Sequence, residues 1–158
     1  FVITEPRWSK PMTEYKEVYE PFLARILEDE WENWLIEEAE QDWRQLLEMA
    51  IPWFKFPRQS LAHDDSGFSG NLDSEEKQII ANYMVYEWTQ RCILTYDNIK
   101  ALYEEKDFSQ ANLLDKLNQT AEAAFNKAQD LERVYYRSRK GKPFQFSKLA
   151  TNLNDVDS

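Results

Sequence analysis

The stretch Leu114–Tyr135, "LDKLNQTAEAAFNKAQDLERVY", decides the fold. Its apolar residues recur in alternating steps of three and four, at Leu114, Leu117, Ala121, Ala124, Ala128, Leu131 and Tyr135. This spacing predicts a helix with a heptad seam, and the alanines in its middle allow a neighbouring helix to approach closely. About three heptads are short for a free coiled coil, so we expect an antiparallel partner helix within the same chain.

The partner helix is predicted directly upstream, over residues 74–103. In "SEEKQIIANYMVYEWTQRC", which begins at Ser74, the apolar residues Ile80, Met84, Trp88 and Cys92 are spaced by four. Asp73 or Ser74 can cap its start, and the acids that follow suit the positive end of the helix dipole. After the break "EEKDFSQAN" we expect Ser109 to cap the heptad helix.

The N-terminal part of the chain carries a further helical pattern that is strongly acidic. Thr13 is the predicted N-cap, Pro21 predicts a kink or restart, and apolar residues from Phe22 to Ala50 form one amphipathic stripe. Between Met12 and Ala50 there are twelve acids against three cations, a net charge of −9. We expect the acidic face to be solvated or to meet a partner; it contains Glu28, Asp29, Glu30, Glu32, Glu37, Glu38, Glu40 and Asp42.

The 158 residues, 30% of them charged and only three of them glycine, predict a single all-α domain. We expect a small helical bundle of three to four helices over residues 13–140, with residues 52–73 as a long loop bounded by proline and aromatic residues. Extended arms are predicted at both ends, over 1–12 and 141–158.

The sequence contains no pattern typical of catalysis or cofactor binding. The glycines are too few for a phosphate-binding loop, and the acid clusters lack the Glu-x-x-His pairs of a di-metal bundle. The one histidine, His63, has no neighbour that suggests a metal site or a triad, and the single Cys92, expected in the core, excludes an intrachain disulfide. No apolar stretch reaches the roughly 18 residues of a membrane span. We predict a protein that is not an enzyme and that uses no cofactor, metal or membrane.

The segment Arg133–Ser147, "RVYYRSRKGKPFQFS", has five cations and no acid, although the whole chain has a net charge of −10. It fits the cationic end of a helix, a contact to nucleic acid, or a contact between copies of the chain. The third interpretation is favoured, because an acidic region and a basic region on one chain suit head-to-tail association. We expect Arg133–Lys140 to finish the helix, and Gly141 and Pro143 to release an extended arm.

Two sets of residues follow as candidate contact sites. The predicted interface with another subunit or with a partner protein consists of Arg133, Tyr135, Tyr136, Arg137, Arg139, Lys140, Lys142, Phe144 and Phe146, with Trp8 of the N-terminal arm. The predicted acidic face, which would meet another subunit or line a channel, consists of Glu30, Glu32, Glu37, Glu38, Glu40 and Asp42.

The order of these elements resembles the head-to-tail adaptor (connector or neck) proteins of tailed bacteriophages. The hexapeptide Tyr83–Trp88, "YMVYEW", is similar to an "LMV-x-EW" motif of such proteins, and Lys106–Leu113, "KDFSQANL", is similar to "KDF…SQANHL". The end Tyr135–Arg139, "YYRSR", resembles a "YSYR" ending. The resemblance covers about residues 13–140. It departs after Trp88, where "TQRCILTYDN" stands instead of a segment richer in proline and lysine, and it does not include the arms.

The resemblance implies a structural virion protein, assembled in the host cytoplasm, that forms a ring, commonly a dodecamer, at the head–tail junction. Such a ring docks beneath the portal, is joined by its arms to the portal and to the stopper or tail, and lets double-stranded DNA pass without specific binding. An acidic lumen would let DNA slide past like-charged walls. The residues alone leave two other interpretations open, an acidic helical module that binds other proteins and a DNA-mimic inhibitor.

Overall fold

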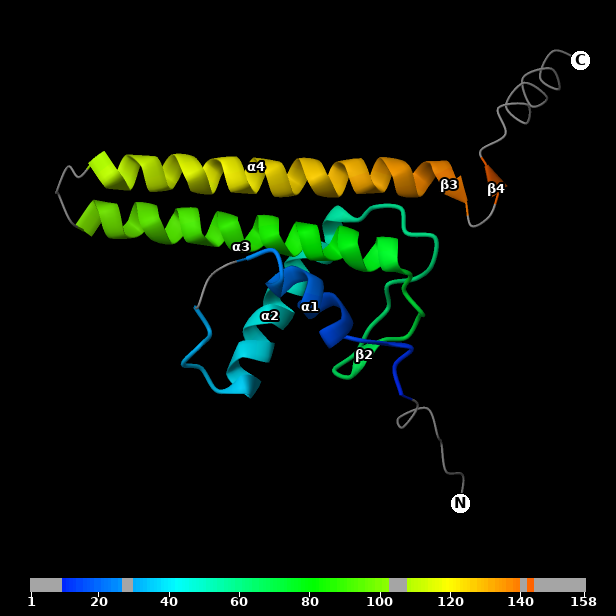
Figure 1. The fold of residues 1–158 in the computed structure, drawn as a ribbon. Coiled ribbons are helices and arrows are strands. Elements are labelled where there is room, and N and C mark those ends of the chain that lie inside the picture. The colour runs from blue at the N-terminus through cyan, green and yellow to red at the C-terminus, as the bar shows by residue number, and fades with distance from the viewer. Residues whose placement is uncertain (1–9, 27–29, 103–107, 140–141, 144–158) are drawn as a thin grey trace, which may run out of the picture.

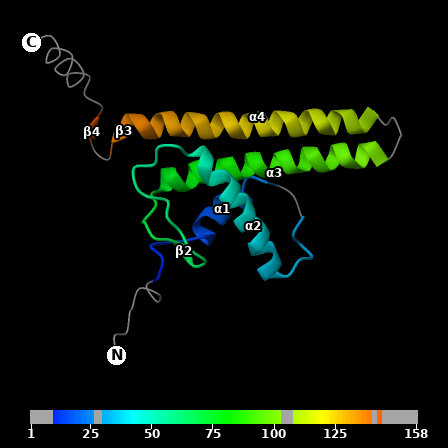
Figure 2. The ribbon, with the colours of Figure 1, turned by 180° about the vertical axis from the view of Figure 1, so that it is seen from behind.

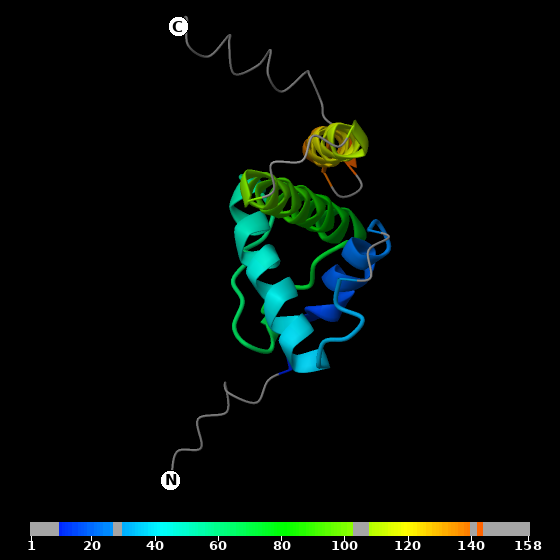
Figure 3. The ribbon, with the colours of Figure 1, turned by 90° about the vertical axis from the view of Figure 1, so that its left-hand side faces the viewer.

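The computed structural model describes residues 10–26, 30–102, 108–139 and 142–143. Two long helices, α3 (Ser74–Leu102) and α4 (Phe108–Arg137), lie antiparallel and side by side (Figures 1 and 2). The shorter helices α1 (Lys16–Leu23) and α2 (Ile36–Ala50) pack on α3 from the side opposite α4 (Figure 3). The prediction of a small all-α bundle is confirmed.

The start of α3 is fixed by a reciprocal capping box. The backbone N–H of Glu76 donates to Asp73 Oδ1 at 2.8 Å, and the backbone N–H of Asp73 donates to Glu76 Oε1 at 3.0 Å. Asp73 is therefore the cap of the two residues predicted. The helix is described as far as Leu102, and the predicted end at Tyr103 lies outside the described residues. The middle of the helix is buried, because it lies between α4 and the two short helices.

The heptad seam of α4 faces α3, as predicted. Ala121, Ala124, Ala128 and Tyr135 are buried, and Leu114, Leu117 and Leu131 are partly buried. The small alanines permit the close approach of the two helices. The helix begins at Phe108, so Ser109 lies inside the first turn and is not its cap.

The prediction of one amphipathic helix from Phe22 to Ala50 is wrong. The helix α1 contains Pro21 and ends at Leu23, and the next helix, α2, begins only at Ile36. Phe22 and Leu47 belong to the same core cluster, whereas one continuous helix would hold them roughly 37 Å apart at the usual rise per residue. The chain must therefore turn between them, so that both segments can pack on α3.

Thr13 is not a helix cap, because it belongs to a small antiparallel pair of strands. Strand β1 (Thr13–Glu14) pairs with β2 (Gly67–Phe68), with Thr13 opposite Phe68. The hydroxyl of Thr13 donates to the carbonyl of Gly70 and accepts from the backbone N–H of Leu72, both at 2.9 Å. Gly67 has φ of 153°, and a Cβ there would lie 2.4 Å from the Thr13 carbonyl oxygen, so only glycine fits this approach.

The predicted loop 52–73 is non-helical after the 3-10 turn η2 (Ile51–Trp53) and carries β2. At the other end of the chain, α4 stops at Arg137 instead of Lys140. Ser138–Arg139 (β3) then pairs with Lys142–Pro143 (β4), so these residues leave the helix for a tight hairpin. The arms lie largely outside the described residues, and so do Trp8, Glu28, Asp29, Lys140, Phe144 and Phe146.

Candidate assembly surfaces

The outer face of the last turns of α4 carries exposed cations and apolar side chains. Arg133 and Arg137 are one helical turn apart and exposed, on the side away from the buried seam. Val134 is 57% exposed and Tyr136 38% exposed, and the ring of Phe56, which is 72% exposed, lies 6.1 Å from that of Tyr136. We call Phe56, Arg133, Val134, Tyr136 and Arg137 the basic patch.

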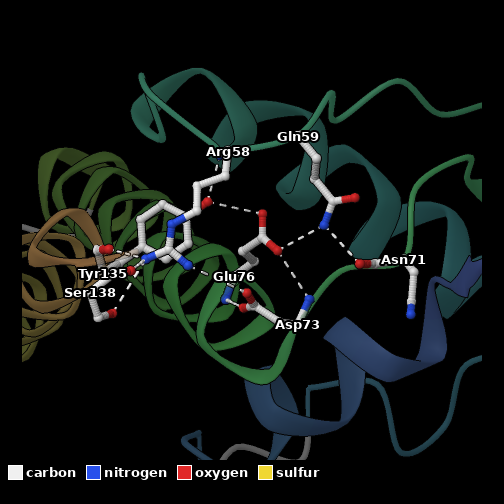
Figure 4. A network of polar contacts seen from close by, with 7 residues as sticks. All are labelled: Arg58, Gln59, Asn71, Asp73, Glu76, Tyr135 and Ser138. Carbon is white, nitrogen blue, oxygen red and sulfur yellow. Dashed lines mark hydrogen bonds and ion pairs between the residues drawn. The ribbon is translucent and has the colours of Figure 1, made fainter. Parts of the chain in front are cut away.

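Tyr135 does not belong to this surface, because its side chain is fully buried. Its ring is covered by the guanidinium of Arg58 at 3.9 Å, and Arg58 donates to the carbonyl oxygens of Tyr135 and Ser138 (Figure 4). These carbonyls belong to the end of α4, where no further turn of helix supplies a donor. Arg58 therefore caps α4 from the loop and fixes the orientation of the basic patch.

A buried carboxylate ties the same loop to the start of α3 and to the end of α4. Glu76 accepts hydrogen bonds from Gln59 Nε2 at 2.8 Å and from the hydroxyl of Tyr135 at 3.2 Å, besides the capping bond from Asp73 (Figure 4). The hydroxyl of Tyr135 in turn accepts from the backbone N–H of Arg58 at 2.6 Å. Burial raises the pKa of Tyr135 to about 12, so this phenol stays a donor at neutral pH.

A second carboxylate, that of Glu132, lies beneath the basic patch and anchors Tyr136. The hydroxyls of Tyr83 and Tyr136 both donate to Glu132, which is buried. Burial and the Glu132 carboxylate raise the pKa of both phenols. The ring of Tyr136 is thus held on the surface with its hydroxyl turned inward.

The predicted acidic face is divided by the structure. Glu32, Glu37, Glu38 and Glu40 are exposed, as an acidic surface requires. Asp42 instead accepts a bidentate pair from Arg91 at 2.7 and 2.9 Å and a hydrogen bond from Trp31 Nε1 at 2.7 Å. Burial opposes its ionisation, but the bonds from Arg91 and Trp31 outweigh burial and lower the pKa of Asp42.

Glu30 is also engaged within the chain. It accepts from Trp88 Nε1 at 2.7 Å and lies 3.6 Å from Arg91. Glu30 and Asp42 therefore join the α1–α2 side to α3, which assigns them an internal contact that the acidic pattern alone did not predict.

An apolar cluster lies beside the exposed acids at the start of α2. Trp34 is 43% exposed, Leu35 66% and Ile36 58%. A hollow of about 390 Å³ next to Trp34 is lined by Asn33, Trp34, Glu38, Gln41, Asp42 and Gln45. We call Trp34, Leu35, Ile36, Glu37 and Glu38 the acidic patch.

Sequence reasoning missed the apolar part of the acidic patch, because it assigned Trp34 and Leu35 to the buried stripe. A signal was present, since three consecutive apolar residues cannot all lie on one narrow face of a helix. Leu35 has extended backbone and is the N-cap of α2, without a side-chain capping bond.

Glu37 and Glu40 face a second hollow, of about 770 Å³, between α1 and α2. Its wall includes Tyr15 and Tyr19, and the guanidinium of Arg44 lies 4.4 Å from the centre of the Tyr15 ring. Burial raises the pKa of Tyr15 to about 12. The hollow thus mixes both charges with aromatic rings.

His63 has partners that its sequence context does not suggest. Its Nε2 lies 2.7 Å from Glu48 Oε1, and its Nδ1 lies 2.7 Å from the carbonyl oxygen of Leu61. Glu48 also accepts from Arg44 Nε at 2.8 Å. The pKa of Glu48 is lowered, because the hydrogen bonds from Arg44 and His63 outweigh its partial burial. The cluster holds the 61–68 loop against α2.

Within the described ranges, no group of three or more His, Cys, Asp or Glu residues is arranged to hold a metal ion. The helices of the same ranges include none that is both long and apolar enough to cross a membrane.

The two patches lie far apart on the molecule. The acidic patch is at the start of α2, the end of that helix that lies furthest from α3 and α4. The basic patch is at the C-terminal end of α4 (Figures 1 and 3). Comparisons with protein-family models, with curated proteins and with solved structures found no match to this chain.

Proposed function

We propose that this chain is a structural protein that associates head to tail into a ring, and that its setting is the head–tail junction of a tailed bacteriophage. The observation that carries the proposal is the wide separation of an acidic patch, at the start of α2, from a basic patch, at the C-terminal end of α4 (Figure 1). The phage setting follows from the motif resemblance in α3 and α4.

Separated opposite charges favour contact between copies for a geometric reason. The patches of one chain cannot reach each other, but each can meet the complementary patch of a neighbouring chain. Such heterologous contacts form a closed ring when the rotation between neighbours closes, and a filament when it does not. Electrostatic complementarity selects this pairing and speeds encounter.

The remaining parts of the molecule suit the same role. The pair of α3 and α4 supplies a stiff body, and the arms predicted at both ends of the chain would join it to a portal above and to a stopper or tail below. Exposed carboxylates outside the contact, such as Glu40 and Glu32, give a surface that DNA does not bind. The proposal therefore needs no catalysis and no cofactor.

The test uses the full purified chain, alone and with the portal ring encoded in the same genome. Mass photometry and electron microscopy should show a ring of uniform copy number, either free or docked on the portal. A chain that stays monomeric at its highest soluble concentration and does not bind the portal overturns the proposal. Formation of a one-to-one complex with a DNA-binding enzyme would instead establish the DNA-mimic interpretation.

A further inference from the structure

We infer that the acidic patch of one copy docks directly on the basic patch of the next copy, and that exposed apolar side chains of both patches take part in the contact. This inference rests on the proposed function and names the surfaces that form the ring. The acidic patch is Trp34, Leu35, Ile36, Glu37 and Glu38, and the basic patch is Phe56, Arg133, Val134, Tyr136 and Arg137.

The composition of the two patches is that of a protein interface. Each places large apolar side chains among charged ones, and Trp, Tyr, Phe and Arg are the residue types enriched at interfaces. In the acidic patch these side chains are adjacent along the chain and more than two-fifths exposed. Exposed apolar side chains that cluster among charged ones are typical of interaction sites.

The charges identify the occupant as a second copy. Glu37 and Glu38 are exposed, and within the described part of the chain neither makes an ion pair. Arg137 is exposed and is likewise unpaired among the described residues, while Arg133 pairs only with Asp130, where both side chains are about two-thirds exposed. Exposed pairs of that kind contribute little, so Arg133 can exchange its partner at small cost.

The hollow beside Trp34 gives the contact a specific geometry. An arginine that enters it can place its planar guanidinium on the face of Trp34, an arrangement that cation–π attraction stabilises. Asp42 in its wall is already bound by Arg91, which leaves Glu38 as the carboxylate that receives the incoming cation. Arg137, which has no ion pair to give up, is the side chain best placed for this position.

The fixed orientation of both patches reduces the entropy lost on docking. Arg58 and Glu132 hold the basic patch from below. The ion pair between Arg91 and Asp42 ties α2, on which Glu37 and Glu38 stand, to α3. Apart from the exposed pair of Arg133 with Asp130, neither patch has to give up an ion pair before it meets the other.

The experiment is a reciprocal charge exchange in the full chain. The acidic variant is Glu37→Lys with Glu38→Lys, and the basic variant is Arg133→Glu with Arg137→Glu. Each alone should associate at least about 100-fold more weakly than the parent, because like charges then face each other across the contact. An equal mixture of the two should assemble again, since each altered patch is complementary to the altered patch of the other variant.

Assembly from the mixture requires strict alternation of the two variants around the ring. The restored rings should therefore have an even copy number and contain both variants equally, as native mass spectrometry can measure.

The matched control for the acidic variant is Asp115→Lys with Glu122→Lys, and that for the basic variant is Lys116→Glu with Lys127→Glu, all exposed positions on α4. These controls carry the same charge changes and should assemble as the parent does. Circular dichroism confirms that each variant is folded.

The outcomes separate the inference from the function on which it rests. If the parent forms rings and both variants do so equally well, or if the mixture does not recover, the two patches are not the contact, and the ring function stands. If the parent forms no ring, alone or on the portal, the proposed function is wrong and the inference falls with it.

Discussion

The two sides of α3 are packed in different ways. Against α4, alanines are buried along most of the seam, and one large ring, that of Phe125, contacts Tyr83 and Tyr86 of α3 beside them. Against α1 and α2, the contact is built from large aromatic rings: Trp31 lies 6.1 Å from Phe22, 5.9 Å from Trp43 and 6.4 Å from Trp88. On the α4 side many small contacts each contribute a little to stability. On the α1–α2 side a few large rings contribute most of it, so the loss of one ring is not compensated by its neighbours.

The largest effect is therefore expected from Phe22→Ala on the aromatic side. Phe22 is fully buried, and the substitution should lower the free energy of unfolding by about 3–5 kcal/mol, as measured by urea denaturation. The control is Phe56→Ala, which removes the same ring from an exposed site and should change it by about 0.5 kcal/mol or less. An equal loss of unfolding free energy in the two variants would show that the ring of Phe22 contributes no more to the core than an exposed ring does.

A smaller loss is expected when the alanine seam is overfilled. Ala128 is fully buried against α3, so Ala128→Leu forces the helices apart and should cost about 1–3 kcal/mol. Ala123→Leu inserts the same side chain on the exposed face of the same helix and should be close to neutral. If Ala128→Leu proves as stable as the parent, the hairpin is not closely packed at this point.

The contrast between the two sides also explains which parts of the fold could be predicted from the sequence. The seam from Leu114 to Tyr135 is local and periodic, and its partner helix lies directly upstream. The pairing of the two long helices could therefore be predicted from their positions along the chain. The split between α1 and α2 was not predictable in this way. It depends on Trp31 reaching Asp42 and Trp88 from outside a helix, a contact between residues far apart in the sequence.

The candidate surfaces follow the same rule. Exposure of Arg133, Arg137, Glu37 and Glu38 could be predicted, because charge alone places side chains at the surface. The burial of Tyr135 depends on Arg58, 77 residues away, and the engagement of Asp42 depends on Arg91, 49 residues away. Neither long-range pair has a signal in a single sequence.

A loss of about 1 kcal/mol, within a range of roughly 0.5–2, is expected from Asp73→Ala, which removes the acceptor for the Glu76 N–H at the start of α3. Ser74→Ala, one residue further on, is the control and should leave the free energy of unfolding nearly unchanged, since Asp73 is the cap. Thermal or urea unfolding followed by circular dichroism measures both. A greater loss from Ser74→Ala than from Asp73→Ala would contradict the capping box and assign the cap to the serine.

The smallest effect on the free energy of unfolding is expected at acidic pH, from the ion pair of Asp42 on α2 with Arg91 on α3. The pKa of Asp42 is lower in the folded chain than its ordinary value of 3.8, so the unfolded chain binds more protons in the interval between the two values, and stability rises with pH across it. The Asp42 contribution is therefore complete above the ordinary value and is lost as the pH falls through the lowered one. Arg91→Gln removes the cation that Asp42 faces, and should reduce this acid-side loss by about 1 kcal/mol or less.

The matched control is Arg133→Gln, which breaks an exposed pair with Asp130 and should leave the pH dependence of unfolding as it is in the parent. Urea unfolding of the three proteins at neutral and acidic pH provides the comparison. If Arg91→Gln retains the acid-side loss of the parent in full, Asp42 draws its low pKa from another source. In that case Arg91 would not neutralise Asp42, and the hollow beside Trp34 would offer an incoming arginine two carboxylates instead of Glu38 alone.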